Sequence, residues 1–317
     1  MKLFLLGKSA GVTHWLEDAA GGLRAAGHAV EVGFTRRPWL SAAVERALES
    51  AFVATTTRRI GKFDPDLVLV IGGFHASPDL LSAVASIAGR APLIGWVGDL
   101  FDDGARALAD LYDAIHYTDS GLQALHRRLG FAPPAGFLPH AVNPAGASTT
   151  ASGATRRNRM VFVANPTAHR RAVVAGVSSA MTLYGPTWRA SPGVDHEIHP
   201  RRVGPNDLRD LYVGHAMALN IRNEHHVLTG LNQRNFEPCL CGAALVTDAQ
   251  PDLALCFEPG AEVLAWRDVE ELNALYDRLL RSPAEAAAIG DRARRRVLAD
   301  HTYAKRLEAL GFPQGRR

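Results

Sequence analysis

Residues 232–248 have the types and spacing of a site for an anionic ligand. The stretch predicts a polar loop, then a short helix closed by Gly242, then an apolar strand over residues 243–247. Asn232 or Asn235 can cap such a helix through a side-chain oxygen. The helix therefore begins next to polar side chains.

Arg234 and Glu237 fall at the amino end of this helix. Unpaired backbone N–H groups and the helix dipole favour an anion there. A carboxylate would repel phosphate, but it suits the hydroxyl pair of a ribose one sugar further away. We therefore assign Asn232, Arg234 and Glu237 to the binding of a nucleoside diphosphate. The alternative is a first-turn acid that compensates the helix dipole, beside an ordinary surface arginine.

These residues lie in the second of two successive α/β patterns. Apolar runs alternate with helical stretches, which is typical of parallel sheets covered on both faces. Residues 145–155 are all small and without periodicity, so they indicate a linker. The expected strands are residues 3–6, 29–34, 67–71, 93–97, 114–117 and 136–138, then 160–164, 181–184, 216–220, 243–247 and 263–265. The expected helices include 12–26, 41–59, 78–88, 120–129, 268–281, 283–299 and 302–310.

The composition is that of a soluble globular protein. The 317 residues suit two domains, with 47% hydrophobic and 21% charged residues. The net charge of +3 permits an acidic substrate or peripheral contact with an anionic membrane, but it does not argue for nucleic acid. The first apolar run is short for a signal peptide, and no run reaches the roughly 18 residues of a membrane span, so we expect a cytoplasmic protein. The three cysteines lie in apolar contexts and indicate core thiols.

Several segments, in their order along the chain, resemble the CgeB-like, or spore-maturation-type, glycosyltransferases. The resemblance covers nearly the full chain and is strongest from residue 159 onward. The similar segments are residues 234–248, 252–268 and 301–303, with 161–165, 183–188 and 218–220 upstream, and more loosely 96–99 and 137–143.

This resemblance implies the GT-B fold, in which two doubly wound Rossmann-like α/β domains face a cleft and C-terminal helices follow. It predicts an N-terminal acceptor domain over residues 1–144, a linker over 145–158 and a nucleotide-sugar domain over 159–300. Residues 301–317 are expected to form a C-terminal helix that can return to the N-terminal domain. The resemblance also makes Glu237 the ribose ligand.

Further candidates for nucleotide binding follow other strands of the C-terminal domain. Arg170 and Arg171 open a helix, where preorganised guanidinium groups would stabilise the charge of a diphosphate leaving group. The alternative for each is an exposed helix charge. At Tyr184 and Gly185, a glycine turn lets the backbone approach a nucleobase, and Trp188 either packs on that base or belongs to the core.

A polar loop after the strand at residues 216–220 is the candidate donor-sugar loop. Its site residues are Arg222, His225, His226, Thr229 and Gly230. Retaining GT-B enzymes often have an acid eight residues before the ribose ligand, and Thr229 stands at that position here. The two-acid pattern is therefore broken, as is normal for the CgeB-like group. The adjacent histidines point in different directions, and the spacing shows no partners for a metal.

The acceptor side is expected at strand ends of the N-terminal domain. Asp99 follows an apolar strand, and an acid there is costly to bury without a role, although it could also cap a helix. His75 follows two glycines at another strand end, and His14 follows the first Gly/Ser turn. We assign catalysis to Asp99, then His75, then His14. His28 and His116 have contexts typical of packing or surface histidines.

The resulting interpretation is a metal-independent transferase, and the resemblance implies that it retains the anomeric configuration. We interpret neither Asp102-Asp103 nor Asp64-Pro-Asp66 as an Asp-x-Asp metal motif. Retention without a covalent carboxylate intermediate implies a front-face mechanism, in which the departing phosphate oxygen accepts the acceptor's proton. The partners are a nucleotide sugar and an acceptor that is a glycan, a protein or a small molecule. We expect no cofactor.

Two other classes remain open at this point. One is a GT-B-fold nucleotide-sugar epimerase, which needs an array of acids and histidines that the loops allow, although the terminal His301-Thr-Tyr303 favours a transferase. The other is a non-catalytic nucleotide-sugar-binding protein, which the missing acid at Thr229 favours.

Overall fold

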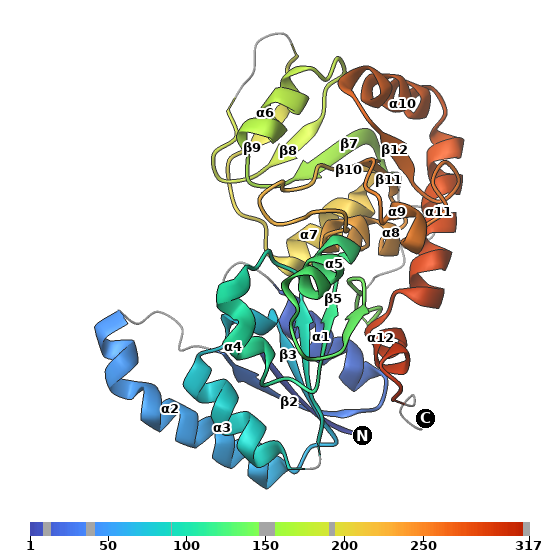
Figure 1. Ribbon diagram of the computed structural model, residues 1–317. Helices are drawn as coiled ribbons and strands as arrows, with labels where there is room; N and C mark the ends of the chain where they lie inside the picture. The colour runs from blue at the N-terminus through green and yellow to red at the C-terminus, as the bar shows by residue number, and fades with distance from the viewer. Residues whose placement is uncertain (9–13, 36–41, 90, 146–155, 190–193, 313–317) are drawn as a thin grey trace. The chain divides into compact units, whose positions relative to one another are not determined.

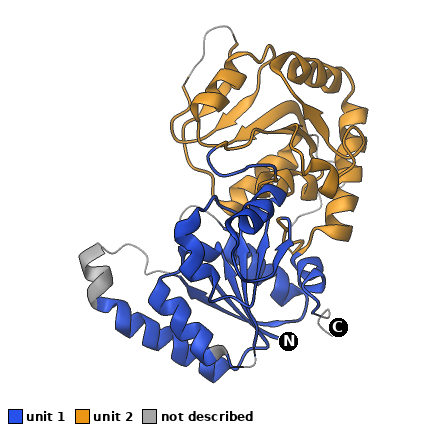
Figure 2. Cartoon of the chain, viewed as in Figure 1, with its two compact units in different colours: residues 1–139, 225–229, 303–317 blue, residues 140–224, 230–302 orange. Residues whose placement is uncertain are grey.

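The computed structural model describes residues 1–8, 14–35, 42–89, 91–145, 156–189 and 194–312. The chain divides into two compact units, shown in different colours in Figure 2. The first unit comprises Met1–Pro139, His225–Thr229 and Tyr303–Arg317, and the second comprises His140–Glu224 and Gly230–Thr302. Most of the predicted linker at 145–158 lies outside the described residues.

The first unit is built on a six-stranded parallel sheet of order β2-β1-β3-β4-β5-β6 (Figure 1). Its central strands β3 and β4 are buried along their whole length, as their continuous apolar sequences require. The chain runs outward from β1 to β2 and then crosses to β3, which creates the switch point of a doubly wound sheet. The strands are β1 (Lys2–Gly7), β2 (Ala29–Phe34), β3 (Leu67–Ile71), β4 (Leu93–Val97), β5 (Ala114–Tyr117) and β6 (Ala135–Phe137).

Helices connect these strands, as parallel pairing requires. Helix α2 packs against α3, and α1 packs against the C-terminal helix α12. The helix predicted over residues 41–59 continues to Phe63. The helices are α1 (Trp15–Ala25), α2 (Ala42–Phe63), α3 (Pro78–Ala88), α4 (Arg106–Ala109), α5 (Ser120–Leu129) and α12 (Tyr303–Ala309), with the 3-10 turns η1 (Gly73–His75) and η2 (Asp103–Ala105).

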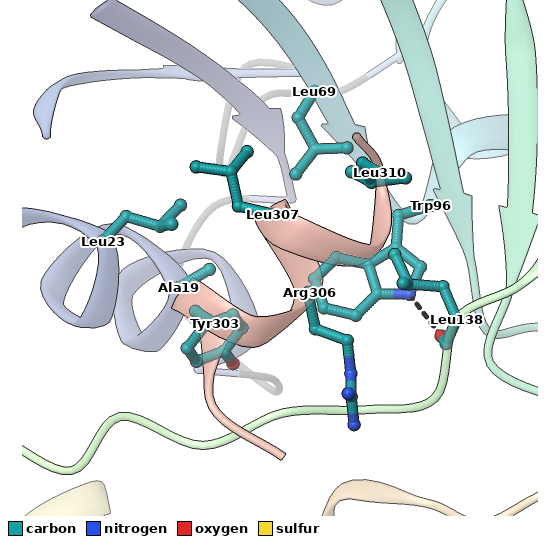
Figure 3. A pocket seen from close by; sticks show the side chains of 9 residues that line it. All are labelled: Ala19, Leu23, Leu69, Trp96, Leu138, Tyr303, Arg306, Leu307 and Leu310. Carbon is teal, nitrogen blue, oxygen red and sulfur yellow. Dashed lines mark hydrogen bonds between the residues drawn. The ribbon is translucent and has the colours of Figure 1, made fainter. Parts of the chain in front are cut away.

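Helix α12 belongs to the first unit although it is the last helix of the chain. Tyr303 packs edge-on against Trp96, whose indole nitrogen donates to the carbonyl oxygen of Leu138 at 2.8 Å. Arg306 is buried, and its Nε donates to the carbonyl oxygen of Pro139 at 2.6 Å. Figure 3 shows these side chains around a cavity of about 10 Å³, the lower limit for one water. This contact therefore anchors the helix and leaves no room for a ligand.

The second unit contains another six-stranded parallel sheet, of order β12-β11-β10-β7-β8-β9 (Figure 1). The edge strand β9 was not predicted, because three residues of Glu-Ile-His carry no apolar run. The other strands match the predicted runs to within three residues at either end. The strands are β7 (Arg157–Val163), β8 (Thr182–Tyr184), β9 (Glu197–His199), β10 (His215–Asn220), β11 (Ala244–Asp248) and β12 (Leu264–Trp266).

Close packing of α11 against the turn after α8 fixes one side of this sheet. A Cβ atom added to Gly290 would lie 2.2 Å from the carbonyl oxygen of Gly242, so only glycine permits this approach. Gly242 itself has a φ of 74° and follows α8 as predicted. The helices are α6 (Ala168–Ala175), α7 (Pro205–Gly214), α8 (Glu237–Leu240), α9 (Leu253–Cys256), α10 (Val269–Arg281) and α11 (Pro283–Asp300), with the 3-10 turn η3 (Gln233–Asn235).

The cysteines Cys239, Cys241 and Cys256 are all buried thiols. Burial raises the pKa of the Cys241 thiol to about 11, which makes it a packing group rather than a nucleophile. No helix in the described part of the chain has the length and apolar character needed to cross a membrane.

Candidate functional site

An amide network joins the carboxyl ends of β10 and β11 to the turn η3. The Asn235 side-chain oxygen accepts from the Asn220 side-chain nitrogen and from the backbone nitrogen of Asn232, each at 3.0 Å. The Asn235 side-chain nitrogen donates to the Thr247 hydroxyl, also at 3.0 Å. Asn220, Asn235 and Thr247 are buried. Because a buried amide is costly to leave unpaired, these mutual contacts hold η3 against the strand ends.

The helix cap differs from the prediction in one respect. Asn232 caps η3, with its side-chain oxygen accepting from Arg234 N at 2.8 Å, whereas Phe236 occupies the cap position of α8. The reason is Pro238, which must lie in the first turn of a helix because it lacks an N–H group. The α-helix therefore starts at Glu237, and a separate 3-10 turn precedes it.

Arg234 and Glu237 both lie at this entry to α8. The Nε atom of Arg234 is buried and has no hydrogen-bond partner among the described residues. A buried donor of this kind costs free energy until a ligand or a water accepts its proton. The charge of Arg234 also lies close enough to Arg170 to lower the pKa of that second guanidinium. Two positive groups therefore share one region of the second unit.

Arg170 and Arg171 occupy different environments. Arg170 is 7% exposed and donates from Nε and Nη2 to the carbonyl oxygen of Ile221, at 3.1 and 2.8 Å, and from Nη1 to that of Asn165 at 3.0 Å. Burial, with the charge of Arg234, lowers its pKa to about 10. Arg171 is exposed and donates to the carbonyl oxygen of Thr187 at 3.0 Å. Arg170 is therefore structurally anchored beside the strand ends, and Arg171 is a surface charge.

Arg222 begins the polar loop and is held by two residues that sequence reasoning did not select. Asp248 Oδ1 accepts from Arg222 N at 3.1 Å, and Gln250 Oε1 accepts from Arg222 Nη1 at 3.0 Å. Gln250 also donates to Asp248 at 2.6 Å. Burial raises the pKa of Asp248 against the effect of these donors. The position of Asp248 at the end of a buried strand was a signal that could have identified it.

The predicted base-binding region follows β8. Tyr184 is buried and stacks on His199, with 4.3 Å between ring centroids and an 11° interplanar angle. A Cβ atom on Gly185 would lie 2.1 Å from the carbonyl oxygen of Ala164, so glycine is required for this close approach. The indole nitrogen of Trp188 donates to that same oxygen at 2.8 Å, and Trp188 belongs to the hydrophobic core. Of the two interpretations of Trp188, the structure therefore supports the core residue.

In the first unit, Asp99 is the centre of a charged cluster. Its Oδ2 lies 2.8 Å from His75 Nε2 and 3.7 Å from Lys8 Nζ, and its Oδ1 lies 3.2 Å from His226 Nδ1. The hydrogen bond from His75, with the charge of Lys8, holds the pKa of the Asp99 carboxyl well below its usual range despite partial burial. The following turn η2 is capped by Asp102 and not by Asp99. The cluster brings together three predicted residues: Asp99 and His75 from the acceptor side, and His226 from the predicted donor-sugar loop.

Residues 225–229 belong to the first unit, although the sequence predicts a C-terminal domain over residues 159–300. Thr229 donates from its hydroxyl to Asp119 Oδ1 at 2.7 Å, and sequence reasoning had not selected Asp119. His225 is exposed, and Gly230 is buried at the point where the chain continues in the second unit. His14 is half-buried at the cap position of α1, where its side chain makes no capping bond.

Comparison with known proteins supports a glycosyltransferase architecture. Residues 158–311 match the family model described as glycosyl transferase-like. Sucrose-phosphate synthase from Thermosynechococcus elongatus superposes with a TM-score of 0.66 at 14% identity, covering 98% of this chain and 97% of that one. HepE from Anabaena, in complex with UDP-glucose, superposes with a TM-score of 0.64 at 14% identity, covering 98% of both chains. AviGT4, a glycosyltransferase involved in avilamycin A biosynthesis, gives 0.63 at 15%, covering 98% and 96%. A comparison with curated proteins gives no match.

The chain therefore has the GT-B fold of two parallel-sheet α/β units, and the family match covers residues 158–311. At identities of this order, the structural similarities establish the fold alone.

Proposed function

We propose that this protein is a glycosyltransferase of the CgeB-like type, which moves a sugar from a nucleoside-diphosphate donor to an acceptor hydroxyl. The family match over residues 158–311 and the GT-B fold support transfer from a nucleotide sugar. The acceptor is a glycan, a protein or a small molecule. The reaction needs no divalent ion in this proposal and retains the anomeric configuration.

The observation that carries the proposal is the entry to α8, where Arg234 and Glu237 lie together. The amide network positions this segment at the carboxyl ends of β10 and β11, where parallel sheets bind their ligands. The buried Nε of Arg234 supplies a donor for phosphate. Glu237 supplies acceptors for the ribose hydroxyls. The turn at Tyr184 and Gly185, at the end of β8, is the proposed contact for the base.

In this proposal, arginines stabilise the leaving diphosphate. Arg234 contacts the phosphates directly, and Arg170 adds a fixed positive charge beside it. Within the described residues, no group of three or more His, Cys, Asp and Glu side chains is arranged to hold a metal ion. Asp99 acts on the acceptor, oriented by His75 on one oxygen and His226 on the other. The Thr229 hydroxyl is already hydrogen-bonded to Asp119. In this proposal, donor-sugar contacts therefore come from Arg222 and neighbouring loop residues.

A binding and turnover experiment tests the proposal. UDP and UDP-glucose are suitable probes because HepE was crystallised with both, and GDP and dTDP sugars extend the series. A ligand at 100 times its dissociation constant should raise the free energy of unfolding by about 2.7 kcal/mol, which a thermal-shift assay detects. Release of nucleoside diphosphate with transfer of the sugar supports a transferase. Interconversion of free nucleotide sugars would instead show an epimerase, and binding without any reaction would show a binding protein.

A further inference from the structure

Residues 225–229 are held in the first unit by two carboxylates, Asp119 and Asp99. We propose that Asp119 is a positioning residue for the transfer reaction: it seats this segment so that His226 contacts Asp99. The inference rests on the proposed function, because it assigns Asp119 a role in organising the acceptor side. It concerns a residue that touches neither nucleotide nor sugar in the proposal.

Asp119 is a buried acid whose two oxygens are both used by the segment. Its side chain is 3% exposed. Oδ2 accepts from the backbone nitrogens of Leu228 and Thr229, at 2.8 and 3.1 Å. Oδ1 accepts from the Thr229 hydroxyl at 2.7 Å and also faces Thr229 N at 3.2 Å. A buried carboxylate needs such donors, so the segment and the acid stabilise each other.

The hydroxyl of Thr229 explains why no acid stands at this position. The hydroxyl donates to Asp119 Oδ1 and accepts from Gly121 N, each at 2.7 Å, so it acts as donor and acceptor at once. An ionised glutamate cannot donate, and its charge would repel the Asp119 carboxylate across a short distance. The departure from the two-acid pattern at Thr229 is therefore coupled to the presence of Asp119.

Apolar burial contributes little to holding the segment, in which Val227 is half-buried. His225 and His226 are exposed, and Leu228 is 41% exposed. The polar contacts to Asp119, together with those of Gly121 and Ser120 to the Thr229 hydroxyl, therefore hold much of the segment. Three residues before Thr229, the His226 imidazole reaches Asp99 Oδ1 at 3.2 Å, on the carboxylate whose other oxygen is bound by His75. Loss of the contacts between Asp119 and the segment should therefore also break the contact between His226 and Asp99.

Asp119 also caps α5, which is an ordinary structural role. Its Oδ1 accepts from the backbone nitrogens of Gly121 and Leu122, at 2.7 and 3.2 Å. The variant Asp119→Asn separates the two roles. An asparagine that keeps its one oxygen on the cap turns its NH₂ group toward the N–H groups of Leu228 and Thr229, so donor faces donor. The cap and the Thr229 hydroxyl contact, both on Oδ1, are kept, whereas the two backbone contacts on Oδ2 are lost.

The first arm of the test is amide hydrogen exchange on the full-length chain. In the wild type, the amides of Leu228 and Thr229 should exchange slowly, and Asp119→Asn should speed both by about tenfold or more. Thr229→Ser keeps the hydroxyl and should preserve protection, whereas Thr229→Glu should abolish it. The control Asp102→Asn alters the cap of η2 and should leave these amides unchanged. Unchanged protection in Asp119→Asn would overturn the inference.

The second arm asks whether Asp119 acts through His226. UDP release from UDP-glucose is measured for Asp119→Asn, His226→Ala and the double variant, with UDP affinity measured by calorimetry. We expect kcat to fall about tenfold in each single variant and little further in the double variant, with UDP affinity within about twofold of the wild type. Additive losses, or a loss confined to UDP affinity, would show a purely structural role.

The two arms separate failure of this inference from failure of the proposed function. If the wild-type protein neither binds UDP nor turns over any nucleotide sugar, the proposed function falls and the positioning role falls with it. If the wild-type protein is active but Asp119→Asn leaves the exchange rates of the Leu228 and Thr229 amides unchanged, only the positioning role is wrong.

Discussion

The imidazole of His75 and the carboxylate of Asp99 face each other at 2.8 Å, from the turn after β3 and the loop after β4. The two strands are hydrogen-bonded neighbours in a parallel sheet, so their carboxyl ends deliver both residues to one edge. Lys8, which follows β1 on the other side of β3, reaches the same carboxylate. Three strand ends thus converge on one charged group, the arrangement expected of a site rather than of a surface ion pair.

Asp99→Asn should reduce sugar transfer by about 10²-fold while nucleotide affinity stays unchanged, because a carboxylate that orients the acceptor is lost and the side-chain volume is kept. Turnover of UDP-glucose and calorimetry with UDP measure the two quantities. Asp102→Asn, in the same loop, is the control and should remain active. Transfer at the wild-type rate in Asp99→Asn would remove Asp99 from the reaction.

Glu237→Ala should weaken the binding of UDP by about 1–3 kcal/mol, the range for a lost hydrogen bond to a charged group. Glu270→Ala is the matched control, because Glu270 is also a first-turn acid, on α10 of the same unit. If Glu237 only compensated a helix dipole, both variants would lower stability slightly and leave UDP affinity unchanged. Calorimetry on the folded variants distinguishes the two cases.

Transfer should survive an excess of chelator, because the proposal assigns the leaving-group charge to Arg234 and Arg170. Arg234→Gln should lower turnover by about 10²-fold, as for the loss of one donor to a developing oxyanion. Arg267→Gln, an exposed arginine paired with Glu271, should have no such effect. Loss of turnover in chelator that manganese or magnesium restores would contradict a metal-independent reaction.

Stability should fall as the pH is lowered from 7.5 to 5.5. Burial lowers the pKa of five histidines below the ordinary 6.5, so the unfolded chain binds protons in this range that the folded chain does not. The free energy of unfolding therefore rises with pH through this window, by about 1.4 kcal/mol per pH unit for each such proton. Urea denaturation at several pH values measures the slope. The histidines are His28, His116, His126, His196 and His215.

His126 offers the clearest single test of this pH dependence. Its Nε2 lies 2.9 Å from the carbonyl oxygen of Pro133, and its Nδ1 lies 2.8 Å from the Tyr117 hydroxyl. A neutral ring that donates from Nε2 and accepts at Nδ1 satisfies both partners, and protonation would end the acceptance at Nδ1. His126→Gln should therefore reduce the slope of stability against pH. An unchanged slope would show that His126 takes no part in it.

The sequence by itself determined the two α/β patterns and most of their strands. Residues 67–71 and 93–97 form β3 and β4 with the predicted bounds, because a fully buried parallel strand must be apolar at every position. The end of α8 before Gly242 was also predicted, because a glycine with positive φ closes a helix, whereas the cap was predicted at Asn232 or Asn235 and is Phe236. These are local constraints that neighbouring residues impose on one another.

Only the tertiary structure decided which side chains meet. Asp119 and Thr229 are 110 residues apart, and their contact depends on the path of a loop without periodicity. The contact between His226 and Asp99 depends on the same loop. The path of an irregular backbone cannot be predicted from residue spacing. Arg170 and Arg171 are neighbours with the same charge, yet the rotation of α6 buries one and exposes the other. Local propensity acts over a few residues, whereas the geometry within each unit depends on how its sheet brings strand ends and distant loops together.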